Sequence, residues 1–378
     1  MIKTIIKKFL NIFPVKKVIL FESVPNLSDN SKAVFDEMIK RGVNQKYKLV
    51  WFVDEKFKPT NKIKNVKYLC FNKGILNKIR SKILHYRVKC LISCNSFLPS
   101  VVKKQKSFYL AHGMPLKSVR GYYTVPNEID YCLVTGQGLL ETTSYEFNFP
   151  QEKLLPLGYP RNDSLVTTKG NNKELFDIDC DKIIVWYPTF RQHVNGKVTA
   201  GGNALPIIHD EKLAIQLNEK AKESRVLIVL KPHFAQNLDN VKNLGLSNII
   251  FIDDEFFIKN NISSYEFVAR CDALITDYSS IYYDFLLCDK PVALIWEDIE
   301  QYKEKPGLIK DYECYSAGAQ KIYNIEEFKE FIDNLANGID KNKEARNQIC
   351  QNIHASQDGQ SSKRVVDFIL GCIDKKEF

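Results

Sequence analysis

Short apolar runs of four to seven residues alternate with segments of helical periodicity along most of this 378-residue chain. Such alternation is typical of a parallel β-sheet covered by helices, because both faces of each strand are then buried. In the first part of the chain the predicted strands are residues 18–21, 47–53, 66–71, 90–94, 108–111 and 131–135. The pattern then restarts, with predicted strands at 183–186, 226–230, 249–252, 273–276 and 292–295.

The restart predicts two doubly wound, Rossmann-like α/β domains that face a cleft, with further helices at the C-terminus. The expected domains are residues 1–165 and 174–378, joined by a polar linker at 167–173. Two domains also agree with a typical size of about 150 residues per domain. Ligands of open α/β sheets bind at the carboxyl ends of the strands, so we expect the chemistry at that edge of both sheets.

Several classes of protein are disfavoured by composition. No apolar run approaches the ~18 residues of a membrane-spanning helix. No small-residue cleavage site follows the first apolar stretch, so a secretory signal is not expected. The ten cysteines are scattered singly and form no CxxC pair. We therefore expect free thiols in a reducing cytoplasm rather than disulfides or a zinc site.

Positive charge is concentrated in the first third of the chain. Residues 1–120 contain 26 Lys or Arg against six Asp or Glu, whereas the remainder contains 28 against 39. A Lys-rich codon usage would enrich both parts, so the asymmetry favours an anionic partner: a nucleic acid, an acidic membrane or a phosphorylated acceptor. Residues 1–13 are predicted to form a basic amphipathic helix. Such a helix either lies in a membrane interface or packs on the domain behind it, and both interpretations stay open.

A histidine motif follows the predicted strand 108–111 directly. It reads His-Gly-Met-Pro-Leu-Lys and spans residues 112–117. A lone histidine is more often structural, but His112 ends a buried strand, and Gly113 beside it lets the backbone approach a ligand. The imidazole group has an ordinary pKa of about 6.5, so it can accept a proton near neutral pH. His112 is therefore a candidate general base.

Cations and a second histidine follow other predicted strands. Arg161 lies in a turn at 158–163, Arg191 follows the strand 183–186, and Lys231 and His233 follow the strand 226–230. Each combines a rigid, proline-containing turn with a positive or protonatable group, which suits an anionic ligand. The alternative is that the arginines are ordinary surface charges.

A hydroxyl-rich turn follows the strand 273–276 and leads into a predicted helix at 279–288. It contains Thr276, Asp277, Ser279 and Ser280. The free N–H groups of a helix start, together with two hydroxyls, can bind a phosphate. The alternative is that Ser279 is only an N-cap, which leaves Thr276 and Asp277 unexplained. Neither a Walker loop nor a GxGxxG fingerprint is found, which disfavours ATP hydrolysis and NAD chemistry.

Taken together, these motifs resemble those of the CDP-glycerol glycerophosphotransferase family, which builds teichoic acids and some bacterial capsules. The resemblance rests on residues 112–117, 158–163, 188–191, 231–233 and 276–280, with 21–23, 29–30 and 358–365 added at the two ends of the chain. It covers nearly the whole chain in order. Two departures are Met114, where the family usually has Thr, and Phe234, where Pro is frequent.

The resemblance implies a GT-B-like fold and a transferase reaction. An acceptor hydroxyl attacks the β-phosphorus of CDP-glycerol, or of another CDP-polyol, and CMP leaves. It implies that His112 is the base and that His233 contacts the phosphate oxygens on the leaving side. The expected ligands of the donor diphosphate are Arg161, Arg191, Lys231, Thr276, Asp277, Ser279 and Ser280; further candidates are Gly113, Lys117, Asp284, Asp358, Ser361 and Ser362. No carboxylate cluster demands a metal or another cofactor, and assistance by Mg²⁺ stays open.

The expected partners are a CDP-polyol donor, a lipid-linked or polymeric acceptor and an anionic membrane surface, with no nucleic acid. The chain is accordingly expected in the cytoplasm, peripherally bound to the inner face of the cell membrane. One alternative is a GT-B glycosyltransferase that uses a nucleotide sugar. A second is a non-catalytic membrane adaptor, which explains the basic first third and leaves the motifs after the strands unexplained.

Overall fold

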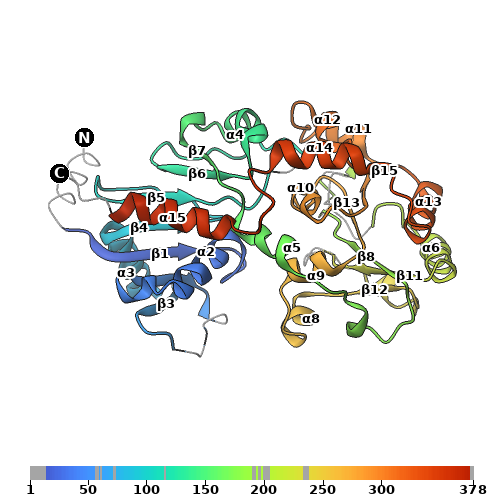
Figure 1. The fold of residues 1–378 in the computed structure, drawn as a ribbon, viewed down its shortest axis with the longest axis horizontal. Helices are drawn as coiled ribbons and strands as arrows, with labels where there is room; N and C mark the ends of the chain where they lie inside the picture. The colour runs from blue at the N-terminus through green and yellow to red at the C-terminus, as the bar shows by residue number, and fades with distance from the viewer. Residues whose placement is uncertain are drawn as a thin grey trace. The chain divides into compact units, whose positions relative to one another are not determined.

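The computed structural model describes residues 14–55, 59, 62–70, 74–114, 116–189, 193–194, 197–198, 205–232 and 238–374. The chain divides into two compact units (Figure 1). Unit 1 comprises Met1–Gly113, Arg120–Asp163 and Ile353–Phe378, and unit 2 comprises Met114–Val119 and Ser164–Asn352.

Unit 1 is built on a seven-stranded sheet in which all neighbouring strands are parallel. Its order is β3-β2-β1-β4-β5-β6-β7, with β1 at Lys16–Glu22, β2 at Lys48–Val53, β3 at Val66–Cys70, β4 at Val88–Ser93, β5 at Lys106–Tyr109, β6 at Tyr131–Val134 and β7 at Leu154–Pro156. The central strands are almost entirely buried, whereas the edge strand β3 is only half-buried. The main helices are α2 (Asp29–Lys40), α3 (Gly74–Arg87), α4 (Leu140–Phe147) and α15 (Ser361–Asp374).

Unit 2 repeats this plan with a six-stranded parallel sheet of order β12-β11-β8-β13-β14-β15. The strands are β8 (Lys182–Trp186), β11 (Val226–Leu230), β12 (Ile249–Phe251), β13 (Ala273–Thr276), β14 (Val292–Ile295) and β15 (Gln320–Ile322). Its longer helices are α6 (Glu211–Glu223), α13 (Ile325–Ala336) and α14 (Lys343–Ile353), with shorter helices α8 (Asp254–Lys259), α9 (Ser264–Arg270) and α10 (Ile281–Phe285). The predicted α/β class, with two parallel sheets and C-terminal helices, is confirmed.

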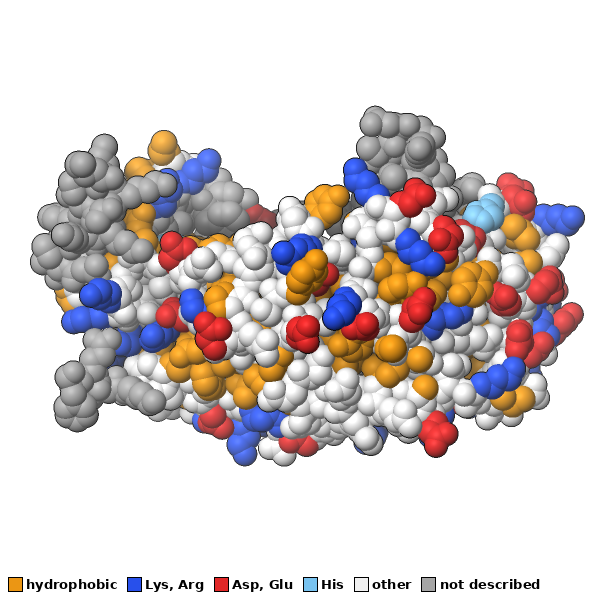
Figure 2. Space-filling model, turned by 90° about the horizontal axis from the view of Figure 1, so that it is seen from above, with side chains coloured by type: hydrophobic (Ala, Val, Ile, Leu, Met, Phe, Trp, Pro, Cys, Tyr) orange, Lys and Arg blue, Asp and Glu red, His pale blue; other side chains and the backbone are white. Residues whose placement is uncertain are grey.

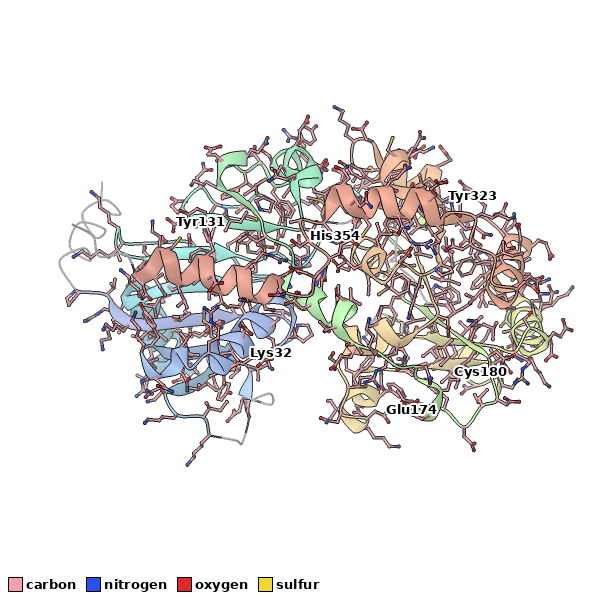
Figure 3. All side chains as sticks on the ribbon, in the orientation of Figure 1. Lys32, Tyr131, Glu174, Cys180, Tyr323 and His354 are labelled. Atoms are coloured by element: carbon pink, nitrogen blue, oxygen red, sulfur yellow. The ribbon has the colours of Figure 1, made fainter. Side chains whose placement is uncertain are left out.

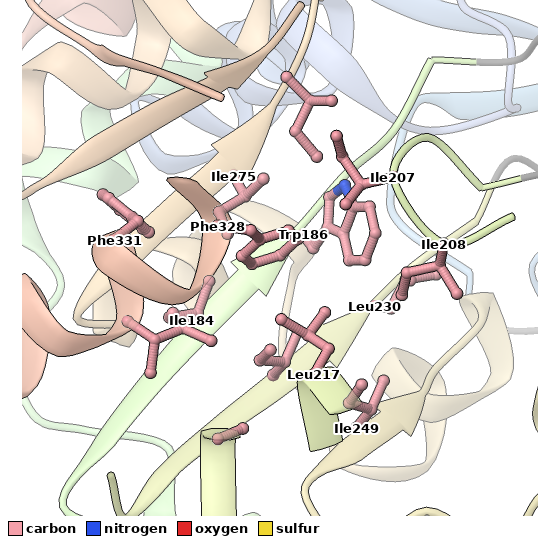
Figure 4. Packing of buried hydrophobic residues seen from close by; sticks show 14 of the residues in the cluster. Ile184, Trp186, Ile207, Ile208, Leu217, Leu230, Ile249, Ile275, Phe328 and Phe331 are labelled. Carbon is pink, nitrogen blue, oxygen red and sulfur yellow. The ribbon is translucent and has the colours of Figure 1, made fainter. Parts of the chain in front are cut away.

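The core of unit 2 gathers around Trp186, the fully buried last residue of β8 (Figure 4). Its ring meets that of Phe328 on α13 edge to face, with the ring centroids 5.3 Å apart. Ile184 lies two residues earlier and therefore points to the same face of the sheet. Leu217 of α6 belongs to the same buried cluster. The two helices α6 and α13 thus bury one apolar face of the sheet, which stabilises the strand ends where the motifs begin.

Side chains fill the layers between strands and helices in both units (Figure 3). All ten cysteines are free, and six of them are buried. Among the helices of the described residues, none is long and apolar enough to cross a membrane. On the face drawn in Figure 2, hydrophobic side chains lie in small patches between charges of both signs.

The C-terminal segment belongs to unit 1, whereas the sequence analysis assigns it to the second domain. Its helix α15 packs against α2. The carboxylate of Asp163 accepts hydrogen bonds from the backbone N–H of Ser361 at 2.7 Å and of Ser362 at 2.8 Å. The first amides of a helix have no partner within it, so Asp163 caps α15 from 198 positions away in the sequence. No local pattern reveals such a contact.

Two further boundaries differ from the prediction. The polar stretch 167–173 is not a linker, because it lies inside unit 2, where Asn172 is fully buried and donates to the Phe267 carbonyl at 2.7 Å. Residues 114–119 also belong to unit 2. There Lys117 pairs with Leu308 in an isolated β-bridge, and the Ser118 N–H donates to the Gly307 carbonyl at 2.8 Å.

The edge strands β7 and β15 are not among the predicted strands. Each has only three residues, and each pairs with a single neighbour. Runs this short carry too few residues to show a period, so they are identified only by their hydrogen-bonded partners.

Gly158 offers a test of how the start of α15 packs on unit 1. Its φ is +84°, and a Cβ atom there would lie 2.5 Å from the Ser361 hydroxyl at the start of α15. Gly121 has nearly the same φ, +82°, with no atom within 4 Å of the Cβ position. We expect Gly158→Ala to lower the free energy of unfolding by about 1–3 kcal/mol more than Gly121→Ala, because only the former adds a steric clash.

Urea denaturation measures both losses, and amide hydrogen exchange at the start of α15 locates the change. Combining Gly158→Ala with Ser361→Gly is expected to recover part of the stability. Equal losses for the two alanine variants would show that the Ser361 contact contributes nothing.

Candidate active site

His112 is presented at the carboxyl edge of the unit 1 sheet. It follows β5, which ends at Tyr109, and its side chain is exposed. Both flanking residues are buried and have positive φ, +52° at Ala111 and +120° at Gly113. Alanine in this region is strained by about 1–3 kcal/mol, and such strain persists only where surrounding contacts hold it. Gly113 has the conformational freedom that the sequence analysis expects of it.

Asn30 supplies those contacts from the first turn of α2. Its side chain is fully buried, and its amide nitrogen donates to the carbonyls of Leu110 at 3.1 Å and Ala111 at 3.0 Å. Its amide oxygen accepts from the backbone N–H of Arg161 at 3.1 Å. One side chain therefore joins the start of α2, the loop that carries His112 and the turn that carries Arg161.

The Arg161 side chain also contacts this loop. Its Nη1 donates to Asp29 Oδ1 at 2.8 Å and to the backbone carbonyl of His112 at 2.9 Å. Both charged side chains are largely buried, with 9% of Arg161 and 13% of Asp29 exposed. The sequence motif predicts that Arg161 neutralises a diphosphate. In unit 1 its charge faces Asp29, and it supports the backbone of the candidate base.

The backbone selects one tautomer of the His112 ring. Nδ1 lies 3.3 Å from the Cys94 carbonyl oxygen, which can only accept a hydrogen bond. Nδ1 therefore carries the proton in the neutral ring, and Nε2 carries the lone pair that accepts one. The Tyr123 ring lies nearly perpendicular to the imidazole, with the ring centroids 6.4 Å apart. This arrangement suits proton abstraction through Nε2.

In unit 2, Thr276 and Asp277 hold two strand exits together. The Thr276 hydroxyl donates to the carbonyl of Tyr187, which follows β8, at 2.7 Å. The Asp277 carboxylate accepts from the backbone N–H of Thr189 at 2.9 Å and of Tyr278 at 2.7 Å. The side chains of Thr276 and Asp277 are fully buried. Burial also raises the pKa of Tyr187, so its phenol stays neutral. These contacts give Thr276 and Asp277 a structural function at the edge where a donor is expected.

Ser279 and Ser280 are half-buried at the start of α10. The helix has five residues and continues as a 3₁₀ turn over Leu286–Cys288. Ser280 is the N-cap residue, yet its side chain makes no capping hydrogen bond. Asp284 is buried in this helix and accepts from the Tyr265 hydroxyl of α9 at 2.7 Å. The serines thus fit the predicted position, while Asp284 has a partner inside unit 2.

The remaining cations and the second histidine are placed differently. Lys231 directly follows β11, and its Nζ lies 3.0 Å from Asp254 Oδ1 at the start of α8. Lys117 is half-buried in the bridge with Leu308. Arg191 and His233 lie outside the described residues, so their predicted roles stay predictions.

The C-terminal motif packs against the motif at 158–163. The Arg364 guanidinium pairs with Asp358 at 2.8 Å and holds the pKa of that carboxyl below its usual range. It also donates to Ser361 Oγ at 3.0 Å, and the Ser362 hydroxyl donates to the Pro160 carbonyl at 3.3 Å. Asp358, Ser361 and Ser362 thereby join the two motifs within unit 1.

Within the described ranges, no group of three or more His, Cys, Asp or Glu residues is arranged to hold a metal ion. The carboxylates named above instead accept hydrogen bonds from backbone amides, hydroxyls or cations.

Two parallel-sheet units with polar motifs at their strand ends define an α/β protein of the GT-B-like class. Residues 5–371 match the profile of the CDP-glycerol:poly(glycerophosphate) glycerophosphotransferase family, and the chain belongs to this family. The family and the transferase class expected from the motifs are confirmed.

Relatives of known function match this chain in sequence along nearly its whole length. The chain is 25% identical over 397 residues to the teichoic acid glycerol-phosphate primase of Bacillus subtilis. This match covers 95% of this chain and 93% of that protein. It is 26% identical to the teichoic acid glycerol-phosphate transferase of Staphylococcus aureus, covering 96% and 95%. Among solved structures, that of the wall teichoic acid polymerase TagF matches with a TM-score of 0.71 and 21% identity, covering 98% of this chain and 94% of that one. The last likeness shows the fold.

The structure adds two residues whose function the motifs do not show. From the sequence, Asp29 and Asn30 are expected only to help cap the helix that ends at Lys40 and to match the N-terminal motif of the family. Both lie at the start of α2, the helix that follows β1, at the carboxyl edge of the sheet where His112 also lies. Their position after a buried strand is the signal that identifies them, whereas the Asn30 side chain and the Asp29–Arg161 ion pair reach residues 80 or more positions away.

We expect Asn30→Asp to lower the free energy of unfolding by about 1–3 kcal/mol, because a carboxylate cannot donate to the two carbonyls that the amide holds. Asn148→Asp is the matched control, since Asn148 is exposed in unit 1. Urea denaturation measures the stability, and ¹⁵N NMR of the imidazole reports the Nδ1–H tautomer of His112. A wild-type stability and an unchanged ring spectrum for Asn30→Asp would remove Asn30 from this support.

Proposed function

We propose that this chain transfers glycerol phosphate, or another polyol phosphate, from a CDP-activated donor to an acceptor hydroxyl in teichoic acid or capsule synthesis. The match of residues 5–371 to the glycerophosphotransferase family carries the proposal. In the reaction the acceptor oxygen bonds to the β-phosphorus of the donor. The bond from that phosphorus to the bridging oxygen breaks, CMP leaves with the oxygen, and the acceptor proton passes to a base.

His112 of unit 1 is the proposed base. Its Nε2 accepts the acceptor proton, while the hydrogen bond from Nδ1 to the Cys94 carbonyl orients the ring. A positioned base typically contributes a factor of about 10²–10⁴ to the rate. The buried contacts of Asn30 and Arg161 hold the loop that carries this ring, so the base does not have to be ordered when substrate binds.

Unit 2 is proposed to bind the donor. Ser279 and Ser280 hold the diphosphate oxygens through their hydroxyls, and Lys231, Arg191 and His233 supply positive charge or protons. Phosphoryl transfer depends mainly on such positioning and on charge neutralisation. Thr276 and Asp277 support these residues by fixing the turn between β13 and α10. A solved structure of a TagF polymerase variant with CDPG, after a 15-minute soak, supports this type of donor.

We further propose that the chain works in the cytoplasm at an anionic membrane surface, where a lipid-linked acceptor is found. The support is the excess of Lys and Arg in residues 1–120. Anionic head groups attract nearby basic residues with about 1 kcal/mol each. The helix predicted at residues 1–13 lies outside the described residues.

The direct test incubates the purified chain with CDP-glycerol or CDP-ribitol and an acceptor analogue, with and without EDTA and added Mg²⁺. Release of CMP that depends on the acceptor is expected. A parallel reaction with UDP-N-acetylglucosamine tests the glycosyltransferase alternative. Transfer of the sugar, with no CMP from either CDP-polyol, would overturn the proposal.

His112→Ala and His233→Ala are each expected to lower the transfer rate by about 10²–10⁴, because each removes a proposed proton carrier. His85→Gln is the control. His85 precedes β4 and lies at the amino edge of the sheet, opposite the carboxyl ends of the strands. Its Nε2 donates to the Pro99 carbonyl, and a glutamine amide can make the same hydrogen bond. Circular dichroism checks that each variant is folded. Near-normal turnover by either alanine variant would exclude that histidine from the mechanism.

Ser279→Ala combined with Ser280→Ala is expected to weaken binding of CDP-glycerol more than it slows transfer at saturating donor. The backbone N–H groups of the turn remain, so the loss is partial. Calorimetry with the donor alone measures the affinity, and initial rates separate KM from kcat. An unchanged donor affinity would place the diphosphate elsewhere.

A further inference from the structure

Helix α3 of unit 1 has its apolar side facing solvent. Among the described residues twelve large hydrophobic side chains are exposed, and four of them lie on this one helix. Ile75 is 74% exposed, Leu76 66%, Ile79 49% and Ile83 56%. Ile75, Ile79 and Ile83 are four residues apart and therefore form one stripe along the helix. An amphipathic helix on a folded domain normally buries such a stripe.

The opposite side of α3 holds the helix on unit 1. Leu84 packs against the buried cluster formed by β1, β2 and β4. His85 Nε2 donates to the Pro99 carbonyl at 2.8 Å, and burial lowers the pKa of this imidazole. Ser81 is half-buried beside it, and its hydroxyl donates to the Asn77 carbonyl at 2.7 Å. The helix thus turns mostly polar side chains inward and leaves isoleucines outside.

The charges of α3 are all positive. Its sequence, GILNKIRSKILHYR, contains four Lys or Arg and no Asp or Glu. At about 100° per residue, Lys78 and Lys82 lie on one flank of the isoleucine stripe and Arg80 and Arg87 on the other. Lys62, Lys64 and Lys67 are exposed on and before the edge strand β3, which contacts α3.

We propose that α3 is an in-plane membrane-binding helix, and this proposal rests on the membrane association put forward above. The side chains of Ile75, Leu76, Ile79 and Ile83 enter the boundary between head groups and acyl chains of an anionic leaflet. The flanking Lys and Arg side chains bind lipid phosphates, as in other interfacial helices.

The charges of α3 favour an anionic membrane, and not a second copy of the chain, as the partner of this helix. Two α3 helices in contact would bring two sets of cations together without a carboxylate between them, which is unfavourable. An anionic lipid surface instead offers negative charge along both flanks and an apolar layer between them. The orientation of α3 then sets which side of unit 1 meets the membrane.

The test compares full-length variants in co-sedimentation with vesicles of phosphatidylcholine alone or mixed with phosphatidylglycerol. Combining Ile75→Ser, Ile79→Ser and Ile83→Ser is expected to weaken binding to anionic vesicles by about tenfold or more. The matched control replaces three exposed isoleucines of unit 2, with Ile215→Ser, Ile258→Ser and Ile339→Ser. It is expected to bind as the wild type does.

Two double charge-reversal variants measure the electrostatic contribution to vesicle binding. Lys78→Glu with Lys82→Glu is expected to reduce binding and its salt dependence. Lys212→Glu with Lys222→Glu, which changes two exposed lysines of α6, is the control of equal charge. Exposed charges are screened within about 10 Å at 0.1 M salt, so wild-type binding should fall as salt rises.

A gain of signal tests the insertion without relying on loss of binding. Ile79→Trp places an indole in the stripe, and brominated lipids should quench it on anionic vesicles, whereas Ile258→Trp should not be quenched. Unquenched fluorescence of the Ile79→Trp variant on bound vesicles, or wild-type binding by the triple serine variant, would overturn the proposal. So would conversion of a dimer to a monomer by that variant with vesicle binding intact.

CMP release with a water-soluble acceptor is measured on every variant. Retained transferase activity together with unchanged vesicle binding would refute the assignment of α3 alone. Absence of CMP release from the wild type would refute the proposed function and leave the vesicle result to stand by itself.

Discussion

Three segments that are far apart in the sequence meet at one buried amide, the side chain of Asn30. It donates to the carbonyls of Leu110 and Ala111 and accepts from the backbone of Arg161. Buried polar groups that lose their partners cost about 1–3 kcal/mol each, so this loop cannot relax its positive φ without breaking bonds that nothing replaces. The position of His112, and with it the proposed proton transfer, depends on this contact together with the hydrogen bond from Arg161 to the His112 carbonyl.

Unit 2 applies the same principle at its own strand ends. The buried Asp277 carboxylate accepts two backbone N–H groups, and Thr276 bonds the carbonyl of the neighbouring strand exit. In both units, then, the buried polar side chains that make these hydrogen bonds support the backbone. The groups proposed to contact substrate lie in the same turn or on the backbone segment that these side chains hold. A site that depends on accurate positioning benefits from such a division, because the reacting groups need no reordering.

This division also explains where the sequence analysis was too coarse. The same residue types bind phosphates and cap backbone amides, so a motif of Ser, Asp and Arg does not say which of its members does which. Arg161 pairs with Asp29, and Asp358, Ser361 and Ser362 tie the C-terminal motif to the turn at 158–163. His112, Ser279 and Ser280 keep exposed or half-exposed side chains at the expected strand ends. The contacts of these residues divide the motifs into side chains that support the backbone and side chains that are presented at the strand ends.

Local periodicity determined the two parallel sheets, the places where polar motifs leave them and, through those motifs, the family. Each of these depends on residues close together in the chain, where burial on both faces of a strand leaves a readable pattern. The tertiary structure alone decided that residues 353–378 complete unit 1, that 167–173 is no linker and that Asn30 supports the His112 loop. It also decided that the apolar stripe of α3 faces outward, since a stripe shows that a helix is amphipathic and not which side is covered. These features depend on partners distant in sequence, and their pairing is settled only when the sheets form.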